Sequence, residues 1–306
     1  MKTLRKKAIS VAAVALLTGL ASASAFAADT PTNPEDTSAS SPIAANVTVV
    51  NNYMYRGISQ SNGKPAIQGG FDYAHESGLY IGNWNSSISW ISDSYGQNGS
   101  VGGKGSAGSS VSGPIEMDFY GGIKKELIGE GFASDLGILQ YYYPTSGIPN
   151  TNGLTANPNS TELYVAQNFT FGPITGFAKV SYAVTTLFGT ANSTGSYYPD
   201  LTVNYDTGVW GLALNGHVGY QYVAGNAPVG ATNYLGKSVS NVSNSTLYSY
   251  TDWKLGVTKD FGGGLSGSVA YVGTNAATYL GSYSYSNPSG KNLGRSTGLI
   301  SLTKVF

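Results

Sequence analysis

The stretch "WGLALNGHVGYQY", residues 210–222, alternates between large apolar side chains and small or polar ones. One parity carries Trp210, Leu212, Leu214, Val218, Tyr220 and Tyr222. The other parity carries Asn215, His217 and Gln221. A period of two is typical of a β-strand with one apolar and one polar face. A length of about ten residues is also what a strand needs to cross a bilayer.

The same alternation recurs along the chain, for example in "IEMDFYGGI", "LYVAQNFTF", "LTVNY" and "DWKLGV". No segment has a convincing helical period. We therefore predict strands near residues 45–56, 65–74, 79–91, 114–125, 132–143, 161–171, 174–185, 197–206, 209–223, 249–260, 265–274 and 296–306.

The connections between these segments alternate between short and long. Short links are predicted at residues 75–78, 172–173, 206–208 and 261–264. Long polar links are predicted at residues 92–113, 144–160, 224–248 and 275–295. Short periplasmic turns that alternate with long extracellular loops are typical of outer-membrane barrels. A β-sandwich or a soluble barrel shares the alternation within strands but has no reason to sort its loops by length.

The sequence therefore predicts an all-β fold. It is a transmembrane antiparallel up-and-down β-barrel of about 12 strands, of outer-membrane type. A barrel of this size lies between the filled eight-stranded kind and the water-filled porins of 16–18 strands. We expect a narrow, partly obstructed pore.

The N-terminus predicts export. Residues 1–27 have a basic start, an apolar run too short to span a bilayer and the small-residue end Ala25-Phe26-Ala27, which is the layout of a cleavable signal peptide. Residues 28–44 are rich in Pro, Thr and Ser and are expected to be a disordered lead-in, which leaves residues 45–306 for the barrel. The first 27 residues hold four of the 16 basic residues and none of the 16 acidic ones, so the mature chain has a net charge of 12 − 16 = −4. An acidic balance argues against nucleic acid as a partner.

The composition agrees with an exported membrane protein. The chain has 42 Gly, 23 Tyr and no Cys, and only 10% of its residues are charged, whereas soluble domains have about 25%. The mature chain has no apolar stretch of the 18 or more residues that a membrane helix needs. We therefore expect the cell outer membrane of a Gram-negative bacterium as the location and its lipid as a partner, with aromatic girdles at both interfaces.

The stretch "NYMYRGISQSNGKPAIQGGFDY", residues 52–73, raises the question of what Arg56 does. The alternation places Tyr53 and Tyr55 on the outward parity and Arg56 on the inward one, since an arginine on the lipid face is penalised. On the next strand Asp72 also points inward, so the two charges are expected to face each other across the first hairpin. Such a pair either holds two strands in register or shapes the field at a constriction.

Parity predicts further inward polar residues. The candidates for the lumen or its constriction are Arg56, Asp72, Glu116, Asp118, Glu162, Lys179, Asp200, His217, Asp252 and Lys254. Lys124 is expected to face inward as well, whereas the strand of Asp135 alternates too poorly for an assignment. Six acids against four bases predict a slight preference for cations.

The C-terminal strand "GLISLTKVF" ends in Phe306. An aromatic last residue on an outward strand resembles the signal that the barrel insertion machinery reads, so that machinery is an expected partner. Lys304 shares the outward parity with Leu302. Near the interface a lysine costs only about 0–1 kcal/mol, so we expect Lys304 to lie there.

The block "YMYRGISQSNGKPAIQGGFDYAHESGLYIGNW", residues 53–84, resembles the N-terminal signature of the TorF porin family of proteobacterial outer-membrane proteins. The similarity rests on "YRGISQ", "PAIQGG" and "DY" and extends over residues 47–90. It implies a barrel of porin type and brings no substrate or site residues with it.

The function that fits best is an outer-membrane channel for passive diffusion of small hydrophilic solutes or ions, as a monomer or a small homo-oligomer. A structural or adhesive barrel that displays its long loops is an alternative. An outer-membrane hydrolase is a second one, but His75 and His217 are the only histidines and neither has an obvious serine partner. The sequence therefore predicts no enzyme, and it has no His/Cys metal cluster and implies no cofactor.

Overall fold

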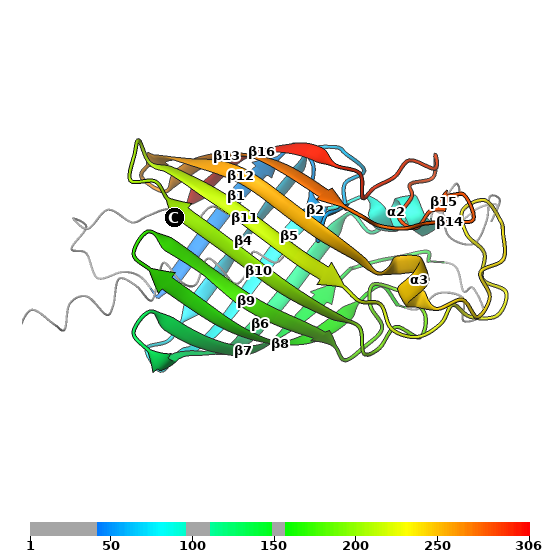
Figure 1. The fold of residues 1–306 in the computed structure, drawn as a ribbon, viewed down its shortest axis with the longest axis horizontal. Helices are drawn as coiled ribbons and strands as arrows, with labels where there is room; N and C mark the ends of the chain where they lie inside the picture. Colours follow the sequence, from blue (N-terminus) through cyan, green and yellow to red (C-terminus); the bar gives the residue numbers. More distant parts are fainter. Residues whose placement is uncertain (1–41, 96–110, 149–156) are drawn as a thin grey trace, which may run out of the picture.

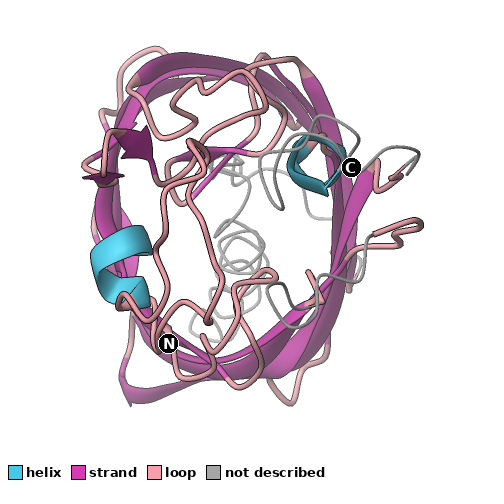
Figure 2. Ribbon diagram, turned by 90° about the vertical axis from the view of Figure 1, so that its right-hand side faces the viewer, coloured by secondary structure: helices cyan, strands magenta, loops and turns pink. Residues whose placement is uncertain are grey.

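The computed structural model describes residues 42–95, 111–148 and 157–306. Within these ranges, twelve strands form one closed antiparallel barrel (Figures 1 and 2). The wall strands are β1 (Ile43–Val50), β4 (Ala66–Ala74), β5 (Leu79–Ser87), β6 (Ile115–Gly129), β7 (Phe132–Tyr142), β8 (Ser160–Phe171), β9 (Ile174–Ala183), β10 (Tyr197–Asp206), β11 (Leu212–Gln221), β12 (Tyr250–Gly262), β13 (Leu265–Thr274) and β16 (Thr297–Val305).

Each wall strand pairs with the next one along the chain, and β1 pairs with β16 to close the barrel. The closing register runs from Asn46 opposite Val305 to Val50 opposite Ser301. Closure leaves no unpaired strand edge. The predicted fold, an all-β antiparallel up-and-down barrel of 12 strands, is therefore confirmed.

The connections sort by length, as predicted. The short ones are residues 75–78, 130–131, 172–173, 207–211 and 263–264. The long ones are residues 51–65, 88–114, 143–159, 184–196, 222–249 and 275–296. The C-terminus lies at the short-connection end, on the left in Figure 1. The opposite end carries the short elements α2 (Trp90–Tyr95), α3 (Asn244–Tyr248), β14 (Thr278–Tyr279) and β15 (Ser282–Tyr283).

Some sequence predictions fall on residues that are not described. The signal peptide at residues 1–27 and most of the lead-in at residues 28–44 lie outside the described ranges. The last two lead-in residues belong to β1, which begins at Ile43. No helix among the described residues is long and apolar enough to cross a membrane.

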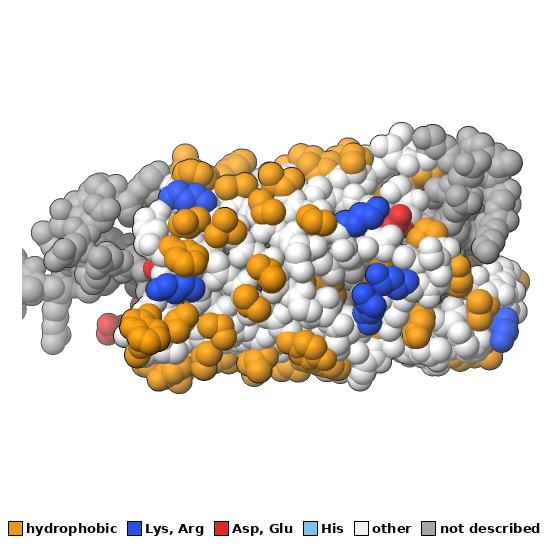
Figure 3. Space-filling model, turned by 90° about the horizontal axis from the view of Figure 1, so that it is seen from above, with side chains coloured by type: hydrophobic (Ala, Val, Ile, Leu, Met, Phe, Trp, Pro, Cys, Tyr) orange, Lys and Arg blue, Asp and Glu red, His pale blue; other side chains and the backbone are white. Residues whose placement is uncertain are grey.

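The outside of the barrel is apolar because alternate residues of each strand point outward. On β12, Leu255 is 69% exposed, while its neighbour Lys254 is buried. Figure 3 shows hydrophobic side chains spread over the wall among uncharged atoms, with Lys and Arg side chains toward its ends. Exposed aromatic residues stand near both ends of the strands: Tyr73, Phe171, Tyr205, Phe261 and Phe306 at the short-connection end, and Tyr142, Tyr182, Tyr197, Tyr220 and Tyr271 at the other. This distribution fits the two aromatic girdles that the sequence predicts.

Lys304 stands at the rim of the wall, where it was expected. It pairs with Leu265, the first residue of β13, next to the short connection 263–264. Its ammonium group donates to the carbonyl of Gly263 and lies 5.2 Å from the ring centre of Phe306. The charged end thus bends away from the apolar wall, as a snorkelling lysine does.

The first long connection folds into the barrel rather than away from it. We call residues 51–65 the in-folded segment. It contains the two-residue strands β2 (Met54–Tyr55) and β3 (Ile58–Ser59), which pair as a small hairpin inside the barrel wall (Figure 1). The prediction that one strand runs from residue 45 to 56 is therefore wrong, because the chain leaves the wall after Val50.

The outward assignment of Tyr53 and Tyr55 is also wrong. Both side chains are buried inside the barrel, with 1% and 7% exposure. The Tyr53 hydroxyl donates to Glu116 at 2.5 Å, and the Tyr55 hydroxyl donates to Tyr141 at 2.8 Å. A tyrosine buried in a polar lumen gains both ring packing and a hydrogen bond, whereas on the apolar outside it gains only the first.

Candidate functional site in the barrel lumen

The tip of the in-folded hairpin is the turn Arg56-Gly57. Their φ angles are +44° and +75°, so both residues have the left-handed conformation that a two-residue hairpin turn of type I′ requires. Glycine adopts this conformation freely, but for another residue it costs about 1–2 kcal/mol. Arg56 therefore needs strong contacts to remain in this position.

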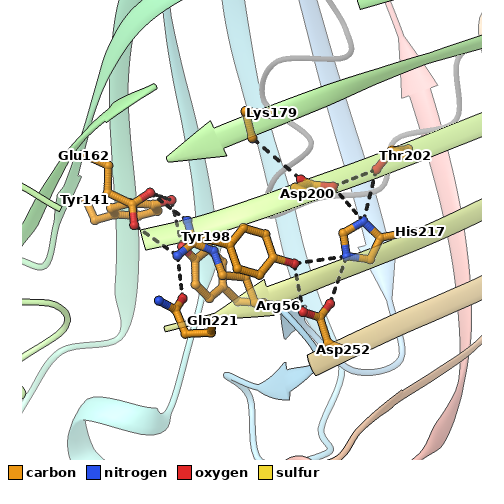
Figure 4. A network of polar contacts seen from close by, with 11 residues as sticks. Arg56, Tyr141, Glu162, Lys179, Tyr198, Asp200, Thr202, His217, Gln221 and Asp252 are labelled. Carbon is orange, nitrogen blue, oxygen red and sulfur yellow. Dashed lines mark hydrogen bonds and ion pairs between the residues drawn. The ribbon is translucent and has the colours of Figure 1, made fainter. Parts of the chain in front are cut away.

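Arg56 makes those contacts with the far side of the barrel (Figure 4). Its Nη2 donates to Glu162 Oε2 at 2.7 Å and its Nη1 donates to Glu162 Oε1 at 3.0 Å. Nη1 also donates to Gln221 Oε1 at 2.6 Å. Glu162 belongs to β8, four strands from β4, and Gln221 belongs to β11, four strands from β1. The hairpin thus spans the lumen from one side of the wall to the other.

The bond between Arg56 and Glu162 is a buried bidentate ion pair. Their side chains are only 1% and 2% exposed. The guanidinium carbon also lies 4.1 Å from the ring centre of Tyr198 and 4.9 Å from that of Tyr55, which adds cation–π attraction. Removing one partner of a buried pair costs about 3–5 kcal/mol, since the other charge is left uncompensated.

A second anchor holds the base of the hairpin. Glu116 on β6 accepts hydrogen bonds from Tyr53 at 2.5 Å and from Tyr143 at 2.7 Å. Within the segment, Asn52 Oδ1 accepts from the hydroxyl of Ser59 at 2.6 Å. The segment is therefore tied to the wall at its tip and at its base.

His217 occupies the centre of a charged cluster next to Arg56. Its Nδ1 lies 3.0 Å from Asp200 Oδ1, and its Nε2 lies 2.9 Å from Asp252 Oδ2. The hydroxyl of Tyr198 donates to Asp252 Oδ1 at 2.8 Å. The ring nitrogens also lie close to two hydroxyls, with Thr202 Oγ1 at 3.1 Å from Nδ1 and Tyr198 Oη at 3.0 Å from Nε2. A general base needs one nitrogen available to take a proton from a nucleophile, whereas here each nitrogen is shared with a carboxylate. The arrangement is typical of a structural charge cluster that joins β10, β11 and β12.

The remaining predicted residues are also inside the barrel but apart from Arg56. Asp72 on β4 accepts a hydrogen bond from Tyr120 at 2.5 Å. The expected pair of Arg56 with Asp72 is therefore wrong, because the hairpin carries Arg56 across the lumen to Glu162 instead. Lys179 Nζ lies 4.0 Å from Asp200. Buried positions in the wall are also taken by Asp118 and Lys254.

Inward tyrosines are a feature of the interior that the sequence patterns do not predict. Tyr80 donates to Asp135 at 2.7 Å and also hydrogen-bonds Tyr164. Asp135, left unassigned from the sequence, is 2% exposed and belongs to the interior. A usable signal exists for Tyr198, which shares its strand parity with the inward Asp200.

The interior of the described barrel is acidic. The buried acids are Asp72, Glu116, Asp118, Asp135, Glu162, Asp200 and Asp252, and the buried bases are Arg56, Lys179 and Lys254. Seven minus three leaves an excess of four carboxyl groups. No group of three or more His, Cys, Asp or Glu side chains in the described ranges has a geometry that could hold a metal ion.

The chain is similar to one protein family over most of its length. The model of a family described as "Bacterial protein of unknown function (Gcw_chp)" matches residues 35–306. Among curated proteins, none matches this sequence.

Solved structures that match include several barrels. One is a KdgM porin, with 4% sequence identity, a TM-score of 0.45 and coverage of 86% of this chain and 97% of that chain. Another is a KdgM porin in complex with disordered oligogalacturonate, with 5% identity, a TM-score of 0.43 and the same coverage. A third is OccAB1 of Acinetobacter baumannii, with 10% identity, a TM-score of 0.42 and coverage of 81% and 60%.

Proposed function

Since the chain belongs to the Gcw_chp family of bacterial proteins of unknown function, we propose its function from its own geometry. It is a channel of the bacterial outer membrane for passive diffusion of small hydrophilic solutes or ions. The observation that carries the proposal is a closed barrel, apolar outside and polar inside, whose lumen is crossed by a segment tied to both sides of the wall.

The membrane location is supported by the outside of the barrel. A large apolar outer surface, such as the face of β12 that carries Leu255, is unfavourable in water and rare in soluble proteins. Closed barrels satisfy every backbone hydrogen bond within the wall, as a bilayer requires. The proposal includes export through a signal peptide at residues 1–27 and recognition of the strand that ends at Phe306 by the insertion machinery. The similarity to the TorF porin family fits this assignment.

The in-folded segment acts as the constriction of this channel. Arg56 and Glu162 bring opposite charges to the same level of the lumen, where a permeating solute has to pass. Rings of charged side chains set ion selectivity in pores. With an excess of four buried carboxyl groups, the channel prefers cations slightly.

The experiment that tests the proposal is single-channel recording of the refolded mature chain in a planar bilayer under a salt gradient. We expect small discrete steps and a reversal potential on the cation-selective side. A folded barrel, verified by its heat-modifiable mobility in gels, that stays silent would overturn the channel. The adhesive barrel would then be the function to pursue, and hydrolysis of lipid and peptide substrates by wild type and His217→Ala would test the hydrolase.

The membrane-spanning wall makes a separate prediction about stability. Leu255 lies in the middle of β12 on the outer face, and Leu255→Lys would place a charge near the bilayer centre. We expect it to reduce the free energy of folding into lipid vesicles by about 2–4 kcal/mol. The reverse change at the rim, Lys304→Leu, is expected to alter it by less than about 1 kcal/mol. The measurement is urea titration of refolding into vesicles, and equal effects of the two changes would contradict the spanning wall.

A further inference from the structure

A cavity opens on the long-connection side of the in-folded segment. Its volume is about 430 Å³, within the range of about 300–1,000 Å³ that is usual for small-molecule sites. The in-folded segment forms part of its lining through Tyr55 and Gln60. The long connections that carry α2, α3, β14 and β15 supply much of the remainder. In a channel, this cavity is the vestibule that a solute crosses before it reaches Arg56.

The described part of the vestibule lining is uncharged. None of the described residues that line it is Asp, Glu, Lys, Arg or His, although the lumen next to it holds the Arg56–Glu162 pair. Tyr95 and Tyr248 in the lining also remain uncharged. Burial raises the pKa of Tyr95 to about 12, and burial raises the pKa of Tyr248 above its ordinary value. A charged ligand loses its hydration here without gaining an opposite charge, so the vestibule favours an uncharged one.

Aromatic rings form much of the surface and are held rigidly. Trp90 packs edge-on against Tyr143 at a centroid distance of 5.2 Å, and Tyr250 packs edge-on against Tyr285 at 5.3 Å. The Tyr285 hydroxyl donates to the carbonyl of Tyr248 at 2.7 Å. Phe188 also lines the cavity, with a φ of +46°. A bulky residue in that conformation is a strained exception, and such strain is concentrated at functional sites.

Residues with polar side chains also line the vestibule. Trp90 Nε1, Asn244 Oδ1 and Ser284 Oγ are buried and have no hydrogen-bond partner within the described ranges. The amide nitrogen of Asn244 is held by the carbonyls of Ala191 and Ala224 at 3.0 and 2.8 Å, which leaves its Oδ1 as an acceptor. These three atoms are enclosed by protein, so a ligand would find its hydrogen bonds on the half-buried polar side chains of the lining, such as Gln60 and Asn233.

Rigid aromatic rings, neutral hydrogen-bonding groups and a described lining without charge together match one ligand class. A sugar ring packs its C–H face on the negative face of an aromatic ring and offers hydroxyls to amides and hydroxyls around it. We propose that the vestibule binds a small uncharged saccharide. This inference rests on the proposed channel for its purpose, and it can be tested without any conductance measurement.

The test is a titration of the refolded full barrel in detergent, followed by tryptophan fluorescence and by calorimetry. The probes are glucose, maltose and maltotriose, with glucuronate as the charged counterpart of glucose that keeps its ring. We expect saturable binding of the neutral sugars and at least tenfold weaker binding of glucuronate than of glucose. Trp90→Ala is expected to weaken maltotriose binding about tenfold or more, the scale of one lost aromatic contact.

Trp253→Ala is the matched control, because Trp253 lies on the outer face of β12. It should leave sugar binding unchanged. If Trp90→Ala does not fold, Phe188→Leu removes a ring but keeps an apolar side chain, and the same loss is expected. No binding of the neutral sugars by wild type, equal binding of glucose and glucuronate, or equal losses in the vestibule and control variants would overturn the proposal.

The two proposals fail separately. Discrete conductance steps without sugar binding would support the proposed channel and contradict the proposed saccharide site. Sugar binding by a barrel that never conducts would support the saccharide site and remove the channel.

Discussion

Arg56→Ala is expected to raise the single-channel conductance several-fold. The change removes the bidentate ion pair with Glu162 and the bond to Gln221, which are the contacts that hold the hairpin tip against the far wall. It leaves Glu162 as a buried charge without its arginine. The conformation with the hairpin tip against the far wall is therefore destabilised by about 3–5 kcal/mol relative to one in which the tip has moved away. The measurement is the distribution of step sizes in a planar bilayer, with wild type and variant recorded in the same salt.

The control for this prediction is Arg295→Ala. Arg295 is exposed in the last long connection, so the variant loses the same charge without freeing the hairpin, and its conductance should stay at the wild-type value. Glu162→Ala should act like Arg56→Ala, since it cuts the same pair from the other side. Arg56→Lys keeps the charge but loses the bidentate geometry, and we expect an intermediate conductance. Wild-type step sizes in Arg56→Ala and Glu162→Ala would show that the in-folded segment does not limit the pore.

The wall of the barrel could be predicted from the sequence because its signals are local. Alternation along a strand depends on neighbouring residues, such as the exposed Leu255 and the buried Lys254. The length of each connection is likewise visible in the chain. Lys304 shows that even an exception can be placed, since the cost of an outward lysine depends on its depth.

The course of the in-folded segment could not be predicted, because its determinants are far away in the sequence. The alternation of Val47 and Val49 continues in Tyr53 and Tyr55, so parity alone extends the strand. What turns the chain inward is the set of hydroxyl partners inside the lumen. These are Glu116, 63 residues from Tyr53, and Tyr141, 86 residues from Tyr55.

The partner of Arg56 has the same kind of origin. Parity placed Glu162 inside the barrel along with five other acids, and nothing near Arg56 distinguishes one that is 106 residues away. The hairpin turn was hidden as well, because a type I′ turn is usually signalled by Asn-Gly or Asp-Gly and here it is Arg-Gly. The vestibule is not visible in the sequence, since most of its rings come from connections without any period, and Tyr250 is the first residue of its strand.

Gly57→Ala is expected to raise the conductance in the same direction as Arg56→Ala, by a different physical route. A Cβ at this position would lie 2.4 Å from Thr274 Cγ2 and 2.8 Å from Asp252 Cβ. Neither neighbour can withdraw easily. The Thr274 hydroxyl donates to the carbonyl of Gly294 at 2.7 Å, and Asp252 is held by Tyr198 at 2.8 Å. The hairpin tip therefore has to move away from its position against the far wall.

The matched control is Gly63→Ala in the same segment. Gly63 has a φ of +73°, nearly equal to the +75° of Gly57, so alanine causes the same backbone strain of about 1–2 kcal/mol at both positions. The nearest atom to its added Cβ is Lys291 Nζ at 3.9 Å, an ordinary contact. Only the clash differs between the two variants, and bilayer recording of both isolates its effect. If the hairpin narrows the pore in its position against the far wall, we expect larger conductance steps in Gly57→Ala and not in Gly63→Ala. Equal steps in both variants and in wild type would mean that solutes pass elsewhere in the lumen, and the constriction would have to be sought away from Arg56.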